Sequence, residues 1–267
     1  MGIYRTLSLL LIVLPVYALP PHVVKLIEPV SNNISLVWTH LGSNHTQSWR
    51  PHQRYNPASL IKLPVLTCLY SRIESGTLLE SDTVVYHDYH TQSGAGILKT
   101  QKPGNRYRLD SLAEMMLRYS DNTATGMLIE HLGRDVINNY MQTMGMGSTW
   151  LRNPRLTQPP QSNQTTAMDI HQLLIKLARY ELISPLRTQH VLSHMKKQIY
   201  RWGIPHRLPR SYRVSNKTGT LGSVRHDAGL IIQGNNAYVL TILTDGLPEN
   251  TRSDTIASIA EALLVTP

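Results

Sequence analysis

The stretch Ser59-Leu60-Ile61-Lys62 places a serine and a lysine three residues apart, so on a helix both side chains lie on one face. A serine hydroxyl becomes a good nucleophile only when a neighbouring group takes its proton. A lysine can take that proton if burial and nearby positive charge lower its pKa. We therefore predict that a helix begins near Ala58 or Ser59, with Ser59 as nucleophile and Lys62 as base. At the first turn of that helix, free backbone N–H groups would also face a developing oxyanion.

A second motif, Ser120-Asp121-Asn122, interrupts a helical pattern that runs from Ser111 to Leu132. The break predicts two helices joined by the motif loop, with Asp121 or Asn122 as the N-cap of the second helix. In such a site Ser120 would relay a proton towards a leaving nitrogen. Asn122 would hold a substrate amide, and Asp121 would brace the loop.

The third motif, Lys217-Thr218-Gly219, lies in a segment that reads as a strand. Lys217 offers a cation to a substrate carboxylate and to the relay serine, and Gly219 lets the strand pass close to a ligand. The N–H of Thr220 would join that of Ser59 as an oxyanion hole. A second Ser-x-x-Lys match occurs at Ser193 to Lys196, but only the copy at Ser59 precedes both other motifs, so the order of the motifs selects Ser59.

Strand patterns cluster at both ends of the chain, and helical patterns fill the middle. A polar loop is expected over 42–57, and a turn at Gly234-Asn235-Asn236 joins two of the strands. We predict an α+β fold in which one antiparallel sheet is built from both chain ends and a helical lobe, about 58–212, is inserted. The expected strands are 34–41, 213–218, 227–233 and 237–244, and the later helices are 136–144, 166–180, 185–195 and 253–265.

The first 18 residues match a secretory signal peptide. An apolar run from Leu7 to Val16 is too short to span a bilayer comfortably, and Val16-Tyr17-Ala18 suits cleavage after Ala18. The expected mature domain is 19–267, periplasmic or secreted and free of the membrane after cleavage; the alternative is a retained anchor. Cys68 is the single cysteine, so no intramolecular disulfide is expected, and its apolar helical context predicts a buried thiol.

The formal net charge of +9 favours an anionic partner. The basic residues are scattered and no aromatic motif is interleaved with them, so we do not expect nucleic-acid binding. A substrate bearing a carboxylate, or anionic cell-wall material such as peptidoglycan, fits an exported protein better. The alternative is that the positive surface serves only solubility.

Two histidine groupings are candidates for a metal site. His87, Asp88 and His90 lie close together in the sequence, and His190 and His194 have helical i, i+4 spacing. Neither grouping offers a third ligand or a general base alongside in the sequence, so we predict no metal and no cofactor. Arg225 and His226 are candidates for extra positive charge beside a substrate carboxylate.

The three motifs, with Ser93-Gly94-Ala95-Gly96-Ile97-Leu98 and Asp227-Ala228-Gly229, resemble the class A β-lactamase family and especially its branch related to penicillin-binding proteins. The resemblance runs from about Ile34 to the C-terminus. It implies the two-lobed β-lactamase or D,D-peptidase fold, and β-lactams or D-Ala-D-Ala peptides as substrates. It also implies roles for individual residues: Ser59 as nucleophile, Lys62 as base, Ser120 as relay, and Lys217, Thr218 and Thr220 in substrate binding.

The chain departs from this family in one loop. Arg152 to Arg155 resembles the start of the deacylation loop and Thr165 to Met168 its close, yet no Asp or Glu occurs from Val136 to Met168. The family's deacylating glutamate would stand near Leu156 or Thr157. Loss of a general base slows the step concerned by a factor of about 10² to 10⁴.

These observations favour an exported serine hydrolase that forms an acyl-enzyme and releases it slowly, as a D,D-peptidase-like enzyme or a weak β-lactamase. One alternative is a fully active β-lactamase with an unrecognised base, for instance Glu181. Another is a non-catalytic cell-wall-binding protein of the same fold. The intact Ser59, Lys62, Ser120 and Lys217 argue against the binding protein, which needs no activated nucleophile.

Overall fold

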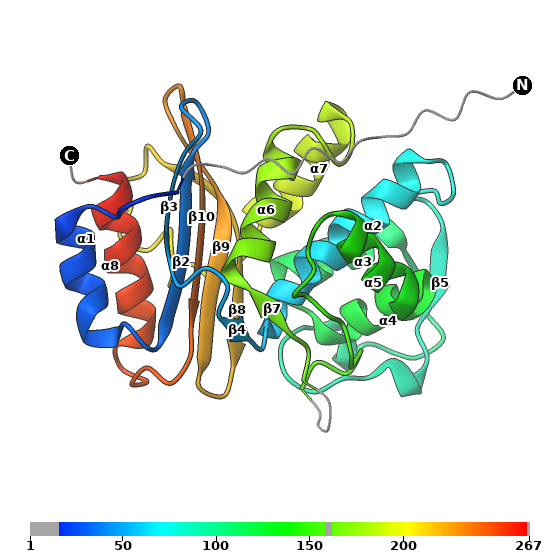
Figure 1. The fold of residues 1–267 in the computed structure, drawn as a ribbon. Coiled ribbons are helices and arrows are strands. Elements are labelled where there is room, and N and C mark those ends of the chain that lie inside the picture. The colour runs from blue at the N-terminus through cyan, green and yellow to red at the C-terminus, as the bar shows by residue number, and fades with distance from the viewer. Residues whose placement is uncertain (1–15, 158–161, 266–267) are drawn as a thin grey trace, which may run out of the picture.

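The computed structural model describes residues 16–157 and 162–265, which form a sheet flanked by helices (Figure 1). The sheet order is β1-β3-β2-β10-β9-β8, and all pairings are antiparallel except that of β1 with β3. The first strands of the chain therefore pair with its last strands, which confirms the predicted sheet. The strand bounds are β1 Val16–Tyr17, β2 Ile34–His40, β3 His45–Trp49, β8 Arg213–Leu221, β9 Val224–Gln233 and β10 Asn236–Thr244.

The predicted polar loop over 42–57 was wrong, because it contains β3 and the short strand β4, Arg54–Tyr55. The pattern hid β3 because its two buried residues, Thr46 and Gln47, are polar. They are satisfied locally: Thr46 Oγ1 lies 2.8 Å from Thr39 Oγ1, and Gln47 Nε2 donates to the Ala18 carbonyl at 2.6 Å. A strand with no apolar alternation gives no period-2 signal.

The predicted signal peptide overlaps this sheet by two residues. Val16 and Tyr17 pair with Thr46 and Gln47 as β1. Residues 1–15 lie outside the described residues, and cleavage after Ala18 stays a prediction. Among the described helices, each is too short or too polar to cross a membrane.

The two faces of the sheet are covered by different helices (Figure 1). On one face lie α1, Pro21–Ile27, and α8, Arg252–Leu264, which pack together over the apolar side chains that alternate along the central strands. On the other face lies α6, Ala167–Ala178, with the helical lobe beyond it. The residues buried between α1, α8 and the sheet include Val23, Ile27, Ile34, Leu36, Ile231, Leu240, Ile242, Ile256 and Ile259.

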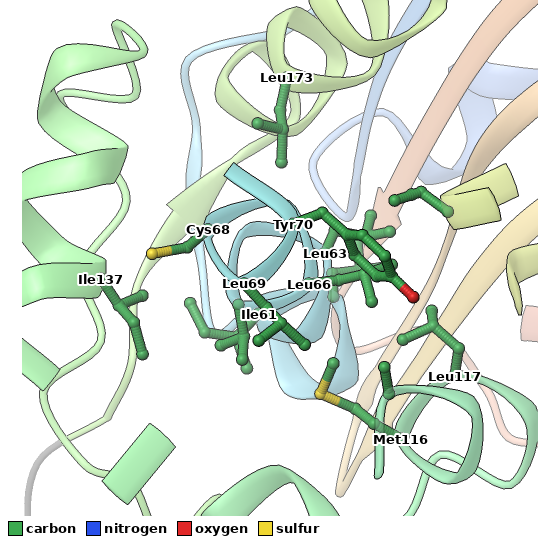
Figure 2. Packing of buried hydrophobic residues seen from close by; sticks show 14 of the residues in the cluster. Ile61, Leu63, Leu66, Cys68, Leu69, Tyr70, Met116, Leu117, Ile137 and Leu173 are labelled. Atoms are coloured by element: carbon green, nitrogen blue, oxygen red, sulfur yellow. The ribbon is translucent and has the colours of Figure 1, made fainter. Parts of the chain in front are cut away.

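The helical lobe is built around α2, Lys62–Glu74, whose side chains are buried on nearly every side. Figure 2 shows side chains from the surrounding helices, among them Met116, Leu117, Ile137 and Leu173, directed at this central helix. Cys68 is buried there and burial raises the pKa of its thiol to about 11, which confirms the predicted buried thiol. The surrounding helices are α3 Leu109–Arg118, α4 Asn122–Leu132, α5 Arg134–Thr143 and α7 Pro185–Lys196.

Short elements complete the lobe and lead into the site. The 3-10 turn η2, Ala58–Ile61, runs directly into α2, and β4 pairs with β7, Thr165–Thr166. The predicted helices agree with the described ones to within a few residues at each end, where helix assignments normally differ. The remaining short elements are η1 Glu28–Val30, β5 Thr83–Val85, η3 Asp88–His90, η4 Leu98–Thr100 and β6 Arg106–Arg108.

Candidate active site

Ser59 lies half-buried in the η2 turn, immediately before α2. The residue before it, Ala58, has a φ of +45°, which side-chain-bearing residues rarely adopt. Two contacts hold this conformation: Asn56 Oδ1 accepts from Ala58 N at 2.9 Å, and His226 Nε2 donates to the Asn56 carbonyl at 2.8 Å. The surrounding structure therefore sustains a strained backbone next to the nucleophile, as is common at functional sites.

Strand β8 passes directly beside this turn. A Cβ at Gly219 would lie 3.1 Å from the Pro57 carbonyl oxygen and 3.4 Å from Ala58 Cβ. The close approach that requires a glycine here is made by the protein's own backbone at Pro57 and Ala58, whereas the sequence predicted a ligand. A larger residue would push β8 away from Ser59. The approach also brings the adjacent Thr220 to the edge of the site.

The loop between α3 and α4 supplies Ser120, whose φ of +52° is again left-handed. Asp121 caps α4 by accepting from Ala124 N at 2.9 Å, and its other carboxylate oxygen accepts from Ile97 N and Leu98 N at 2.7 Å each. The predicted cap and the predicted bracing role of Asp121 are confirmed. Because all these contacts use its carboxylate, Asp121 is committed to holding the loop.

Ser120 joins the nucleophile to the lysine. Its hydroxyl donates to Ser59 Oγ at 2.8 Å, and Lys62 Nζ donates to Ser120 Oγ at 3.1 Å. Lys62 Nζ also donates to the Ser120 carbonyl at 2.6 Å and to Asn122 Oδ1 at 2.8 Å. The structure therefore brings Ser59, Lys62, Ser120 and Asn122 together, with Ser120 as the bridge.

Lys62 is fully buried, and burial followed by the positive charge of Lys217 lowers its pKa well below the usual range, against the opposing charge of Asp121. A neutral amine has two N–H donors and one lone pair. A neutral Lys62 would donate to Ser120 O and Asn122 Oδ1 and would accept from the Ser120 hydroxyl, with the hydrogen between Lys62 and Ser120 Oγ reversed from the arrangement above. The Ser120 hydroxyl would then accept from the Ser59 hydroxyl instead of donating to it, which gives a proton path from Ser59 through Ser120 to Lys62.

Lys217 occupies the site differently from the prediction. Its amine is fully buried and donates to Gln198 Oε1 at 3.0 Å and to the Thr218 carbonyl at 2.7 Å, rather than to the relay serine. Burial lowers its pKa to about 7, with the charge of Asp227 opposing the shift. Thr218 is held by the same glutamine, since Gln198 Oε1 accepts from both its N–H, at 3.0 Å, and its hydroxyl, at 2.9 Å.

Sequence reasoning missed Gln198. It follows the C-terminal end of α7, belongs to no motif, and reaches the site only because α7 packs against β8. Its position three residues beyond the end of the predicted helix, 185–195, carries no signal of this role.

Asp227 lies behind Lys217 on β9. Its carboxylate accepts from Asn216 Nδ2 at 2.8 and 3.0 Å and from Ile204 N at 2.7 Å. Burial raises the pKa of this carboxyl to about 7. A Cβ at Gly203 would lie 2.3 Å from this carboxylate, so the packing around it is tight. Asp227 therefore anchors the strand that carries Lys217.

The prediction of positive charge at His226 was wrong. The ring is buried, its Nδ1 accepts from Thr244 N at 3.1 Å, and the remaining proton sits on Nε2, which donates to Asn56 O. Burial lowers its pKa to about 4, so the imidazole is neutral near pH 7. Arg225, in contrast, remains at the site: it lies over the Trp202 ring and donates to Thr220 Oγ1 at 3.1 Å.

The loop after Arg155 is connected to Lys62 by hydrogen bonds through Ser93 and Asn122. Thr157 Oγ1 lies 3.0 Å from Ser93 Oγ, and the Ser93 carbonyl accepts from Asn122 Nδ2 at 2.8 Å, while Leu156 N donates to Gln92 Oε1 at 3.3 Å. Thr157 is therefore one residue, Ser93, removed from Asn122 and its contact with Lys62, whereas Leu156 contacts Gln92, the residue before Ser93. The candidate base Glu181 is exposed in the turn after the far end of α6.

A cavity of about 260 Å³ lies behind this loop, lined by Tyr89, His90, Glu130, Pro154 and Arg155 among others. None of the predicted catalytic or substrate-binding residues lines it. His90 Nε2 contacts Glu130 there at 3.1 Å, and its Nδ1 accepts from the backbone of His87. Both ring nitrogens of His90 are thus in use within this wall.

Comparisons with known proteins agree with this geometry. Residues 22–266 match the family model described as the beta-lactamase enzyme family. A β-lactamase of Rhodobacter capsulatus is 27% identical over 132 residues, covering 49% of this chain and 45% of that protein, so the match spans less than half of the relative's length. The solved structure of PBP-A superposes with a TM-score of 0.87 and 26% identity, covering 93% of this chain and 96% of that one. A leucine-to-glutamate variant of PBP-A, solved as an acyl-enzyme with penicillin G, gives a TM-score of 0.86, 26% identity and coverage of 92% and 96%.

Proposed function

Since the chain belongs to the beta-lactamase enzyme family, we propose that it is an exported serine hydrolase that is acylated by β-lactams or D-Ala-D-Ala peptides and deacylates slowly. The observation that carries the proposal is the hydrogen-bonded series Ser59, Ser120 and Lys62 in a loop environment without a carboxylate. The hydrogen-bonded series provides for acylation of Ser59. The loop without a carboxylate lacks the base that would activate water for deacylation.

The proposed acylation begins when the Ser59 proton passes to Ser120 Oγ and the Ser120 proton passes to the neutral amine of Lys62. Ser59 Oγ then bonds to the carbonyl carbon of the substrate. Backbone N–H groups of Ser59 and Thr220 stabilise the oxyanion. As the C–N bond breaks, the proton returns from Lys62 through Ser120 to the leaving nitrogen, and Ser59 stays acylated.

The substrate carboxylate is proposed to lie beside Arg225 and the Lys217-Thr218 segment. The Arg225 guanidinium donates a hydrogen bond to Thr220 Oγ1 at 3.1 Å, so it lies next to the residue whose N–H is proposed to form part of the oxyanion hole. An arginine suits a planar carboxylate because its N–H groups form two parallel hydrogen bonds. The fully buried Lys217 would act mainly through Gln198 and Thr218, which it holds in place.

Deacylation is proposed to be slow because the residues that approach the site from the loop, Leu156 and Thr157, cannot accept a proton from water. Asp121 is occupied by three backbone N–H groups, and Glu181 is exposed beyond α6. The PBP-A variant with glutamate in place of leucine was solved as a penicillin G acyl-enzyme, which supports the proposed acylation step by a β-lactam.

The backbone at Ala58 and Ser120 has positive φ angles, which are strained for residues with side chains. Such strain is typical of catalytic sites, so it favours an enzyme over a non-catalytic wall-binding protein. We further propose that the protein works in the periplasm or outside the cell, where the predicted signal peptide would send it. Its positive charge there suits peptidoglycan.

The test is intact-mass spectrometry of the mature protein mixed with a penicillin and followed over time, with Ser59→Ala as control. We expect an adduct of one drug mass that persists for many minutes and is absent from the variant. An adduct that disappears as the drug is consumed would show efficient turnover and refute slow deacylation. Failure of the unmodified protein to form any adduct would refute acylation itself.

A further inference from the structure

The histidine pair on α7 gains a third partner that the sequence did not reveal. Asp110, in the first turn of α3, lies against His190 and His194. The prediction that this pair lacks a third ligand was therefore wrong, because the packing of α3 on α7 brings a carboxylate from 80 residues earlier in the chain. Among the described residues, this is the one group of three that can converge on a metal ion.

The three ligand atoms are already spaced for a metal ion. Asp110 Oδ1 lies 3.3 Å from His190 Nε2 and 3.2 Å from His194 Nε2, and the ligand atoms all lie within 4.8 Å of one another. In a tetrahedral site with ligands about 2.0–2.1 Å from zinc, neighbouring ligand atoms are about 3.4 Å apart. The two imidazoles reach this point from successive turns of one helix, with ring centroids 4.9 Å apart.

A single carboxylate oxygen is crowded by donors in this arrangement. Asp110 Oδ1 faces the two imidazole nitrogens and also the Tyr70 hydroxyl at 3.2 Å, and each contact is long for a hydrogen bond to a carboxylate. The Tyr70 hydroxyl also lies 2.9 Å from His194 Nε2, so it competes with Asp110 for the same nitrogen. A cation held between Asp110, His190 and His194 would replace these competing contacts with coordinate bonds.

The surrounding charges favour a cation at this position. Glu74, Glu80 and Asp110 line the region, and Arg187, which pairs with Glu80 and lies 3.8 Å from Glu74, is the cation among them. Three carboxylates against one guanidinium leave two negative charges in excess, although the chain as a whole is strongly positive. Nearby, Glu114 is shared by Lys197, at 2.7 Å, and Arg118, at 3.4 Å, so that cluster adds one positive charge and one negative charge remains in excess.

The outer contacts also suit metal ligation. His190 Nδ1 lies 3.4 Å from Glu80 Oε1, so a carboxylate stands where the second nitrogen of a ligating histidine normally donates. His194 is buried, and its Nδ1 has no hydrogen-bond partner among the described residues; its Nε2 lies 2.9 Å from the Tyr70 hydroxyl, which can donate to an Nε2 lone pair. His190 and Asp110 are each about one-third exposed, which leaves a path from solvent.

We propose that Asp110, His190 and His194 form a site for one divalent transition-metal ion, with zinc as the best match to two imidazoles and a carboxylate. The ion would link the start of α3 to α7 and complete its coordination with water. This site lies apart from the serine site and does not depend on the proposed function.

The link would strengthen the framework of the active site. Downstream of Asp110, α3 leads to Ser120, and downstream of His194, α7 leads to Gln198. The two ends are joined by a hydrogen bond from Ile199 N to Arg118 O at 3.1 Å. An ion between the helices would therefore stabilise the pair of segments that carry the relay serine and the glutamine of Lys217.

The test uses the mature protein without a polyhistidine tag, stripped with a chelator and titrated with zinc by calorimetry. We expect one ion per chain, and a melting temperature that rises by about 5–10 °C at a free zinc concentration 100-fold above the dissociation constant. Cobalt substituted for zinc should give the intense visible absorption of a low-symmetry, four-coordinate site. No stoichiometric binding and no such spectrum in the unmodified protein would overturn the proposal.

Matched variants then locate the ion. His190→Ala should weaken zinc binding by about 100-fold or more, and Glu80→Gln by about 10- to 100-fold, while His131→Gln changes an exposed histidine of α4 and should have no effect. Equal affinity of His190→Ala and the unmodified protein would place the ion elsewhere and overturn the assignment. Ser59→Ala should bind zinc normally, which keeps this result separate from acylation.

Discussion

Replacing Leu156 by glutamate should convert a long-lived acyl-enzyme into one that turns over. Leu156 is half-buried, and its N–H is held by Gln92 next to the Ser93 and Asn122 contacts that lead to Lys62. A glutamate there would place a carboxylate beside the acyl-serine, where it could take a proton from water. Partial burial would raise its pKa and so bring it closer to that of an effective base at neutral pH.

The expected gain is set by general-base catalysis, at about 10² to 10⁴ in the deacylation rate. The weak anchoring of residue 156 argues for the lower part of that range, because among the described residues its hydrogen bond is the 3.3 Å contact from its N–H to Gln92. Stability should fall by about 1–2 kcal/mol, since Leu156 packs against the core and a charged group replaces part of that contact.

The assay is the decay of the penicillin adduct measured by mass spectrometry after excess drug is removed. Leu156→Gln is the matched control, with nearly the same shape as the glutamate but no basic group, and it should decay at the original rate. Thr157→Glu tests the neighbouring position, where Thr157 now contacts Ser93 Oγ at 3.0 Å. Equal decay of all three variants and the unmodified protein would refute the reasoning that a missing loop carboxylate limits deacylation.

Three further predictions test the site and its support. Ser120→Ala should slow acylation by about 10² to 10⁴, because it removes the bridge between Ser59 and Lys62; a single-turnover rate close to that of the unmodified protein would exclude the relay. Gln198→Ala should lower the free energy of unfolding by about 1–3 kcal/mol, because it leaves the Lys217 amine short of an acceptor, and an unchanged urea midpoint would contradict this. The pKa of His226 falls from 6.5 to about 4 on folding, so its contribution to the free energy of unfolding, about 3 kcal/mol, is present above pH 6.5 and lost as pH falls through 4. Urea titrations at several pH values should show that His226→Gln loses less stability in acid than the unmodified protein does. An identical acid profile for the two proteins would refute the assignment.

Local patterns accounted for much of this protein. Helix and strand boundaries followed from apolar periodicity and from caps such as Asp121, both of which act over a few residues. The Ser59, Ser120 and Lys217 motifs were recognisable because each is a short run of chemically distinctive residues. The strand β3 escaped prediction, since its buried residues are polar and depend on hydrogen bonds to Thr39 and Ala18.

By itself, the sequence determined which groups could do chemistry, and it also determined that the segment from Val136 to Met168, which includes the deacylation loop, contains no carboxylate. Only the tertiary structure decided the partners of those groups. It placed Gln198 against Lys217, made His226 a neutral support for the nucleophile turn, and added Asp110 to the α7 histidines. The physical reason is that pKa values, hydrogen bonds and metal geometry depend on burial and on atoms a few ångströms away, which the packing of distant segments brings together.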